Sequence, residues 1–125
     1  MGKKILLFII LVFSVKTFAQ TNAPMPRAHH LVIVWLKQHG DENARRQYIE
    51  GSKRLSKLPG VVTYHIGKPL KREHPSPALD DSYDIAISST FERLQALENY
   101  SKHPEHQKVI HEVLKPLVDK YKVYD

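Results

Sequence analysis

HHLVIVWLK, residues 29–37, is the most informative run of the chain. β-Branched and aromatic residues dominate it, which is typical of a β-strand. Alternate side chains of a strand point to opposite faces. Both faces are apolar here, one with Leu31, Ile33 and Trp35 and the other with Val32, Val34 and Leu36. Such a strand is covered on both sides, so we expect helices against one face and a further layer against the other.

The segments that follow this strand alternate between helical and extended patterns. Asp41 is a suitable N-cap for a helix that Pro59-Gly60 would end. His103-Pro104 would separate two helices, because a residue before proline disfavours helical geometry and proline fits a first helical turn. The expected elements are a helix over 42–57, strands over 61–67 and 83–91, helices over 92–101 and 104–118, and a strand over 121–125. This β-α-β-β-α-β order predicts an α+β, ferredoxin-like fold.

A sheet of this topology carries its helices on one face and leaves the other face open. Since the first strand is apolar on both faces, the open face is expected to pack against a second copy of the chain. The sequence therefore predicts a homodimer that is held together by sheet-to-sheet contact.

The N-terminal segment has the three-part pattern of a secretory signal peptide. Lys3 and Lys4 begin Met1–Ala19, an apolar run follows, and Thr17-Phe18-Ala19 is a suitable cleavage site. An uncleaved anchor is the alternative, although the apolar run is short for a membrane crossing. We expect an exported protein, periplasmic or secreted, without stable membrane insertion after cleavage. Residues 20–27 would be a flexible lead-in to a single domain over 28–125.

Composition narrows the possible functions. The chain has 125 residues, of which 42% are hydrophobic, and no cysteine. This excludes a disulfide scaffold, a cysteine zinc site and a thiol nucleophile. Removal of residues 1–19 takes away three lysines and no acidic residue, so 19 basic residues become 16 against 13 acidic ones, a net charge of +3. That balance gives little support to a nucleic-acid partner, and we expect none.

The chain has eight histidines, and two of them, His103 and His106, lie in the cluster Tyr100-Ser101-Lys102-His103-Pro104-Glu105-His106. Tyrosine offers a phenolic hydrogen bond and histidine titrates near neutral pH. Tyr100 and His106 could therefore polarise a carbonyl group and move a proton, with His103 close by. In the other reading, which the spacing by itself favours, His103 caps the helix break and His106 is solvated.

Metal binding and a role for Asp84 rest on weaker patterns. A metal site needs about three convergent ligands. His103 and His106 supply two, whereas His111, five residues after His106, would lie about 140° around an α-helix. We therefore expect neither a metal nor a cofactor. Asp84, at the start of the third strand, could orient a histidine at a ligand site or make a hydrogen bond at the strand end.

Taken together, several segments resemble the stress-responsive A/B barrel (Dabb) family. They are the first strand, the LPGV turn at Leu58–Val61, the strand YDIAISSTF and the segment ALENYSKHPEHQKV. The most specific element is the Y-x-x-H-P-x-H string of Tyr100, His103, Pro104 and His106, and His30 also matches.

The resemblance implies a ferredoxin-like protomer in a dimeric α+β barrel. One plant branch of the family closes linear polyketides. The resemblance to that branch implies that its acid/base pair corresponds to Tyr100 and His106 here, and that a further histidine of its cavity corresponds to His30. A third cavity residue of that branch, a strand histidine, is Ile85 here.

Four functions remain open at this point. The first is a small-molecule binding protein, with a pocket between sheet and helices that uses His30, Tyr100, His103, His106 and Asp84. The second is a cofactor-free enzyme, similar to the polyketide cyclases or another proton-transfer enzyme, in which Tyr100 and His106 are catalytic. The third is haem or metal binding through a histidine, and the fourth is a purely structural dimer.

Overall fold

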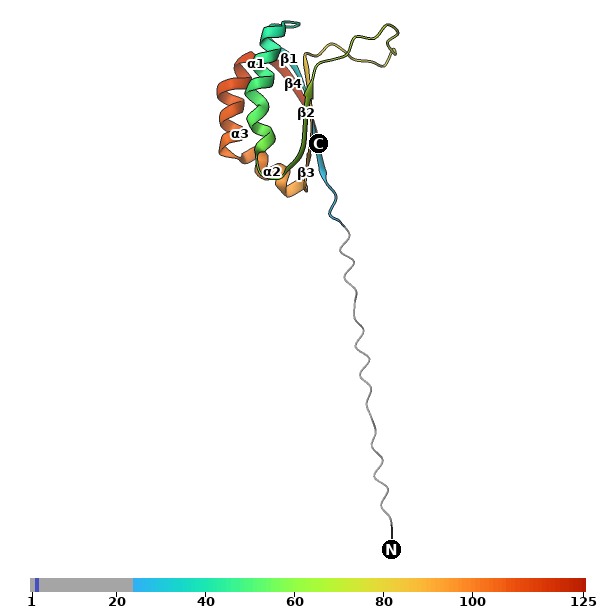
Figure 1. Ribbon diagram of the computed structural model, residues 1–125, viewed down its shortest axis with the longest axis vertical. Helices are drawn as coiled ribbons and strands as arrows, with labels where there is room; N and C mark the ends of the chain where they lie inside the picture. Colours follow the sequence, from blue (N-terminus) through green and yellow to red (C-terminus); the bar gives the residue numbers. More distant parts are fainter. Residues whose placement is uncertain (1, 3–23) are drawn as a thin grey trace.

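The computed structural model describes residue 2 and residues 24–125 (Figure 1). The predicted signal peptide lies outside the described residues apart from Gly2, and so do residues 20–23 of the predicted lead-in. Within the described part of the chain, no helix has the length and apolarity to cross a membrane.

The order of strands and helices is the predicted one. The elements are β1 (Ala28–Leu36), α1 (Glu42–Ser52), the 3₁₀ segment η1 (Lys53–Lys57), β2 (Val61–Gly67), β3 (Ile85–Phe91), α2 (Leu94–Lys102), α3 (Pro104–Val109), the π-helical turn η2 (Ile110–Leu114), the 3₁₀ turn η3 (Lys115–Leu117) and β4 (Val118–Tyr124). The sheet has the order β2-β3-β1-β4, and all neighbouring strands are antiparallel. This is the ferredoxin-like fold.

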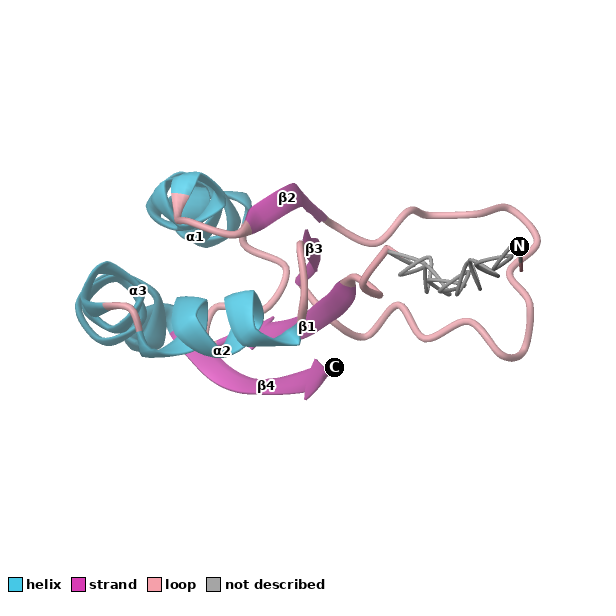
Figure 2. Ribbon diagram, turned by 90° about the horizontal axis from the view of Figure 1, so that it is seen from below, coloured by secondary structure: helices cyan, strands magenta, loops and turns pink. Residues whose placement is uncertain are grey.

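The described helices all lie on one face of the sheet, as Figures 1 and 2 show. Residues of β1 with even numbers face the helices, and the core forms between the two layers. Its buried apolar side chains are Val34, Leu36, Ile85, Ile87 and Phe91 from the sheet and Ala44, Tyr48, Leu55, Ala96, Leu97, Tyr100, Val109 and Leu114 from the helical layer.

The opposite face of the sheet has no covering layer in the described chain. Leu31, Ile33 and Trp35 lie on it, and the Trp35 ring packs under the ammonium groups of Lys120 and Lys122, at 4.8 and 6.0 Å from the ring centroid. The loop of residues 68–84 between β2 and β3 projects away from the helices (Figures 1 and 2).

Several element boundaries differ from the sequence predictions. The helix expected over 42–57 becomes 3₁₀ from Lys53, and the one expected over 104–118 changes winding twice, at Ile110 and Lys115. The third strand begins at Ile85 rather than at residue 83, because Asp84 turns its carboxylate into the loop after β1. The last strand begins at Val118, since it pairs with β1 from Leu36 onward.

Gly51 explains how the two long helical segments approach each other. A Cβ atom at this position would lie 2.5 Å from Cγ1 of Val113 in η2 and 3.3 Å from Leu114. A methyl group cannot be accommodated at such a separation unless the Val113 side chain or η2 itself shifts. The glycine in the middle of α1 therefore allows η2 to pack closely against it, which positions one wall of the site described next.

Candidate functional site

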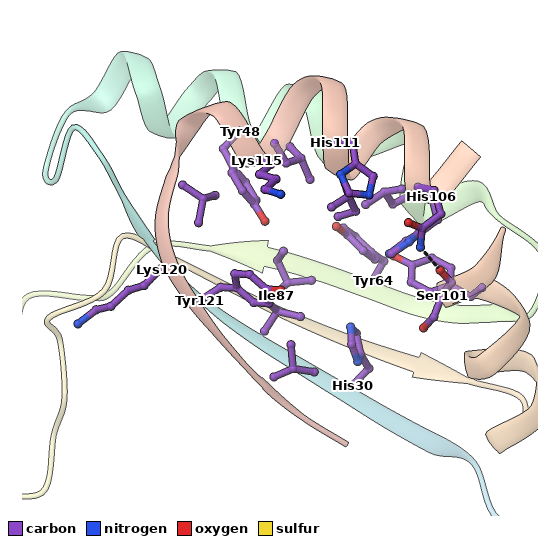
Figure 3. A pocket seen from close by; sticks show the side chains of 18 of the residues that line it. His30, Tyr48, Tyr64, Ile87, Ser101, His106, His111, Lys115, Lys120 and Tyr121 are labelled. Atoms are coloured by element: carbon purple, nitrogen blue, oxygen red, sulfur yellow. Dashed lines mark hydrogen bonds between the residues drawn. The ribbon is translucent and has the colours of Figure 1, made fainter. Parts of the chain in front are cut away.

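A cavity of about 760 Å³ lies between the helix-facing side of the sheet and the segment α3–η3 (Figure 3). Aromatic and aliphatic side chains make up much of its wall, with a few polar groups among them. The lining residues that matter most below are His30, Tyr48, Tyr64, Tyr100, His106, His111 and Lys115. Its volume is in the range of small-molecule sites, which are typically about 300–1,000 Å³.

Tyr100 and His106 come together because the helix breaks between them. Tyr100 lies in the last turn of α2, and Pro104 starts α3 directly afterwards, so that the two ring centroids are 4.5 Å apart. Tyr100 also packs against Phe91, at 4.8 Å between centroids. Both residues line the cavity. His106 is therefore not simply solvated, as the alternative interpretation of the sequence had it.

The environment fixes the protonation states of this pair near neutral pH. Burial lowers the pKa of His106, and the charges of His30 and His103 act in the same direction. A hydrogen bond with the Ser101 backbone acts to raise this pKa, but does not outweigh them. Its Nδ1 atom is buried and has no hydrogen-bond partner in the described structure. Burial also raises the pKa of Tyr100 far above neutral pH. The pair is therefore a neutral imidazole that can accept a proton beside a hydroxyl that can donate a hydrogen bond.

His30 reaches the same cavity from β1. Its Nδ1 atom lies 2.5 Å from Oδ1 of Asp125, and its ring meets Tyr100 edge-on at 6.4 Å between centroids. An ionised carboxylate only accepts hydrogen bonds, so the Nδ1 of His30 carries the proton in this contact. The contact holds the ring in place beside Tyr100.

The structure places His103 and Asp84 outside the cavity lining. Nδ1 of His103 accepts a hydrogen bond from the backbone N–H of Glu105 at 3.1 Å, which caps α3. His103 thus has the capping role that the second interpretation assigned to it.

Asp84 is completely buried at the start of β3 and belongs to a structural cluster. Its carboxylate accepts hydrogen bonds from the backbone N–H groups of Leu36 and Gly40, both at 2.8 Å, and from Nδ1 of His39 at 3.0 Å. Burial acts to raise the pKa of Asp84, but these hydrogen bonds outweigh it and lower that pKa. The hydrogen bonds to backbone N–H groups match the strand-end role, and the histidine that Asp84 contacts, His39, does not line the cavity; a ligand-site role of Asp84 stays a prediction.

Two tyrosines of the cavity were not among the sequence candidates. Tyr48 comes from α1 and Tyr64 from β2, and burial raises the pKa of both phenols. The Tyr64 hydroxyl is buried without a hydrogen-bond partner among the described residues, and the Ser52 hydroxyl beside it donates to the Ile49 carbonyl at 2.9 Å. In the sequence, Tyr48 lies within the predicted helix over 42–57 and Tyr64 within the predicted strand over 61–67, and no local signal links the two.

His111 corrects a sequence prediction. Regular α-helical winding would have turned it away from His106, yet both line the cavity, and Lys115 lines it as well. The reason is the π-helical turn η2, in which the backbone N–H of Lys115 bonds to the carbonyl of Ile110. A wider turn brings residues spaced by four or five closer to one side than an α-helical turn does, and Figure 3 shows His106, His111 and Lys115 directed toward the sheet. No three His, Asp or Glu side chains of the described residues converge as a metal site.

With this geometry established, comparison with known proteins identifies the family. Residues 28–125 match the model of the Stress responsive A/B Barrel Domain, Dabb. The chain belongs to the Dabb family. None of the curated proteins matches the chain in sequence.

Solved structures agree with this fold. A Dabb protein with a ferredoxin-like fold from Mesorhizobium loti is 23% identical, with a TM-score of 0.65 over 78% of this chain and 92% of that one. A hydroxynitrile lyase from Passiflora edulis is 21% identical, with a TM-score of 0.65 over 82% of this chain and 92% of that one. A protein of unknown function from Thermobifida fusca, described as dimeric, is 16% identical, with a TM-score of 0.61 over 78% and 87%. At these identities the likeness concerns the fold.

Proposed function

We propose that this Dabb protein binds a small organic molecule in the cavity between the sheet and α3–η3. One observation carries the proposal. The Tyr64 hydroxyl and Nδ1 of His106 are the buried side-chain polar atoms of the described chain that lack a hydrogen-bond partner, and both residues line the cavity. Leaving a buried polar atom unpaired costs about 1–3 kcal/mol. A ligand that reaches both atoms after a small shift of the two side chains, and supplies partners to them, would recover that free energy.

A second candidate function is proton transfer at a carbonyl compound without a cofactor. The close pairing of Tyr100 with a neutral His106 supports it. In this reaction His106 removes a proton from the substrate while the Tyr100 hydroxyl donates a hydrogen bond to the carbonyl oxygen as charge develops on it. A hydroxynitrile lyase with the same fold gives this candidate further support.

Native mass spectrometry of the protein, expressed with its N-terminal segment and purified gently, tests the binding proposal. We expect extra mass that is released on unfolding. Tyr100→Phe keeps the ring and removes only the hydroxyl, so it should leave the fold intact and reduce retention of the ligand. If the variant unfolds, Tyr100 is a core residue only. If no small molecule is retained and none of a chemically diverse set binds, the cavity is not a binding site.

The oligomeric state and the location of the protein are also proposals. The homodimer is supported by the apolar residues Leu31, Ile33 and Trp35 that β1 places on the uncovered face of the sheet and by the dimeric relatives of the same fold. Export is supported by the signal-peptide pattern of residues 1–19. An intact mass of the purified protein that begins at residue 20 would establish cleavage, and a full-length mass would contradict it.

A further inference from the structure

We propose that the ligand of this cavity carries an anionic group, such as a carboxylate, which binds at Lys115 and His111. Its apolar body would extend from there toward Tyr64 and His106. This inference rests on the proposed binding function and adds the chemical class of the ligand. The argument begins with the winding of the helical layer.

The π-helical turn gives the cavity a cationic edge. Lys115 and His111 are spaced by four residues, and so are His111 and Gln107, and all three side chains line the cavity. Regular α-helical winding would rotate such a series by about 40° at each step. The wider turn over Ile110–Leu114 offsets this drift, so that Lys115 reaches the cavity instead of leaving it (Figure 3).

The Lys115 ammonium has no fixed carboxylate partner. Within residues 24–125 it forms no ion pair, although two carboxylates lie at the cavity. Asp125 is bound to His30 at 2.5 Å, and Asp119 lies beyond ion-pair distance of Lys115. The other lysine of the rim, Lys120, covers the Trp35 ring on the opposite face of the sheet. Lys115 is therefore the cation available to a ligand.

The rest of the cavity suits the uncharged part of such a molecule. Val32, Leu55 and Ile87 supply apolar wall, and Tyr64 and His106 line the cavity as well. An anion that is partly withdrawn from water interacts more strongly with an ammonium group than one in bulk solvent. The arrangement fits an amphiphilic organic acid with its charged group at Lys115.

Two fluorescent probes that differ only in an anionic group test the inference. They are 1-anilinonaphthalene-8-sulfonate and its neutral counterpart N-phenyl-1-naphthylamine, titrated against the purified protein. Because Lys115 is exposed, we expect Lys115→Met to weaken sulfonate binding by about threefold to fivefold and to change binding of the neutral probe by less than about twofold. Lys115→Arg should retain sulfonate binding. Lys108→Met is the matched control, because Lys108 is exposed on α3 and does not line the cavity.

The outcomes separate this inference from the binding proposal. If the neutral probe binds but Lys115→Met leaves sulfonate binding unchanged, the inference is wrong and the cavity remains a binding site. If neither probe binds to the wild-type protein, both are overturned. Amide chemical-shift changes by NMR should be concentrated at residues that line the cavity. Changes confined to the open face of the sheet would count against both proposals.

Discussion

At the residue scale, each histidine of the site owes its properties to its neighbours. His106 is held neutral by burial, His30 is held in place by Asp125, and His103 caps a helix. Spacing in the sequence could indicate the capping role of His103, but not the roles of the other two, because Asp125 follows β4 and the burial of His106 depends on how the helices pack on the sheet. The pairing of Tyr100 with His106 was the part that local spacing could suggest, since both belong to one helix break.

His106 should make the protein less stable in mild acid. Its pKa is lower in the folded state than in the unfolded state, so the unfolded chain binds more protons as the pH falls. The free energy of unfolding should therefore decrease as the pH drops below the unfolded value of about 6.5. Urea unfolding at several pH values measures this. His106→Gln should remove that part of the pH dependence, and an unchanged profile would show that His106 is solvated.

Asp84 should prove essential for stability and dispensable for binding. Asp84→Asn disturbs hydrogen bonds to two backbone N–H groups and removes the buried negative charge beside Arg45, which keeps its ion pair with Glu42. We expect the free energy of unfolding to fall by about 2–4 kcal/mol. Chemical denaturation measures the loss, and probe binding by the folded variant should match wild type. If the folded variant binds the probes more weakly than the folded wild-type protein, Asp84 contributes to the ligand site.

At the element scale, the helical layer is where sequence reasoning was least accurate. The periodicity of apolar residues over 104–118 predicted one continuous helix, and the structure has three kinds of winding there. Close packing against α1 accompanies this change, and an apolar repeat contains no information about such a contact. The strands were predicted better, since β1 and β2 are set by their own β-branched residues and β1 occupies the centre of the sheet.

Gly51→Ala tests whether the approach of α1 positions this layer. The added methyl group would meet Val113, whose branched side chain has little freedom to move. We expect a loss of about 1–3 kcal/mol in the free energy of unfolding, together with weaker sulfonate binding. Adding Val113→Ala should make room and restore probe binding in part. If the Gly51→Ala variant is as stable as the wild-type protein, the packing of α1 against η2 does not depend on the glycine, which would contradict this prediction.

At the scale of the whole molecule, the sequence predicted the topology because its elements follow one another in the order of a known arrangement. Both faces of β1 are apolar, and the single chain covers one of them. The cavity was harder to predict, since its walls come from every layer of the fold and meet only after folding.

Ile33→Lys tests the homodimer. Ile33 lies at the centre of the uncovered face, between Ala86 and Lys122, and a charge there would be buried in a sheet-to-sheet contact. We expect a dimer mass for the wild-type protein and a monomer mass for the variant in analytical ultracentrifugation. Leu94→Lys is the control, because Leu94 is 63% exposed on the helical side. A wild-type monomer at micromolar concentration would contradict the proposal.

The π-helical turn also has a genetic consequence. Such a turn holds one residue more than the equivalent α-helical turn, so loss of a single codon within 110–114 would restore regular winding. The residues after it would keep nearly the same rotation relative to those before it, because the wide turn itself takes up the extra residue. Loss of a codon in α3, before the turn, would instead rotate Lys115 by about 100° relative to the residues that precede the deletion. Among descendants of one ancestral gene, loss of one residue within the wide turn would therefore preserve the ligand preference, whereas the same loss in α3 would change it without a new fold.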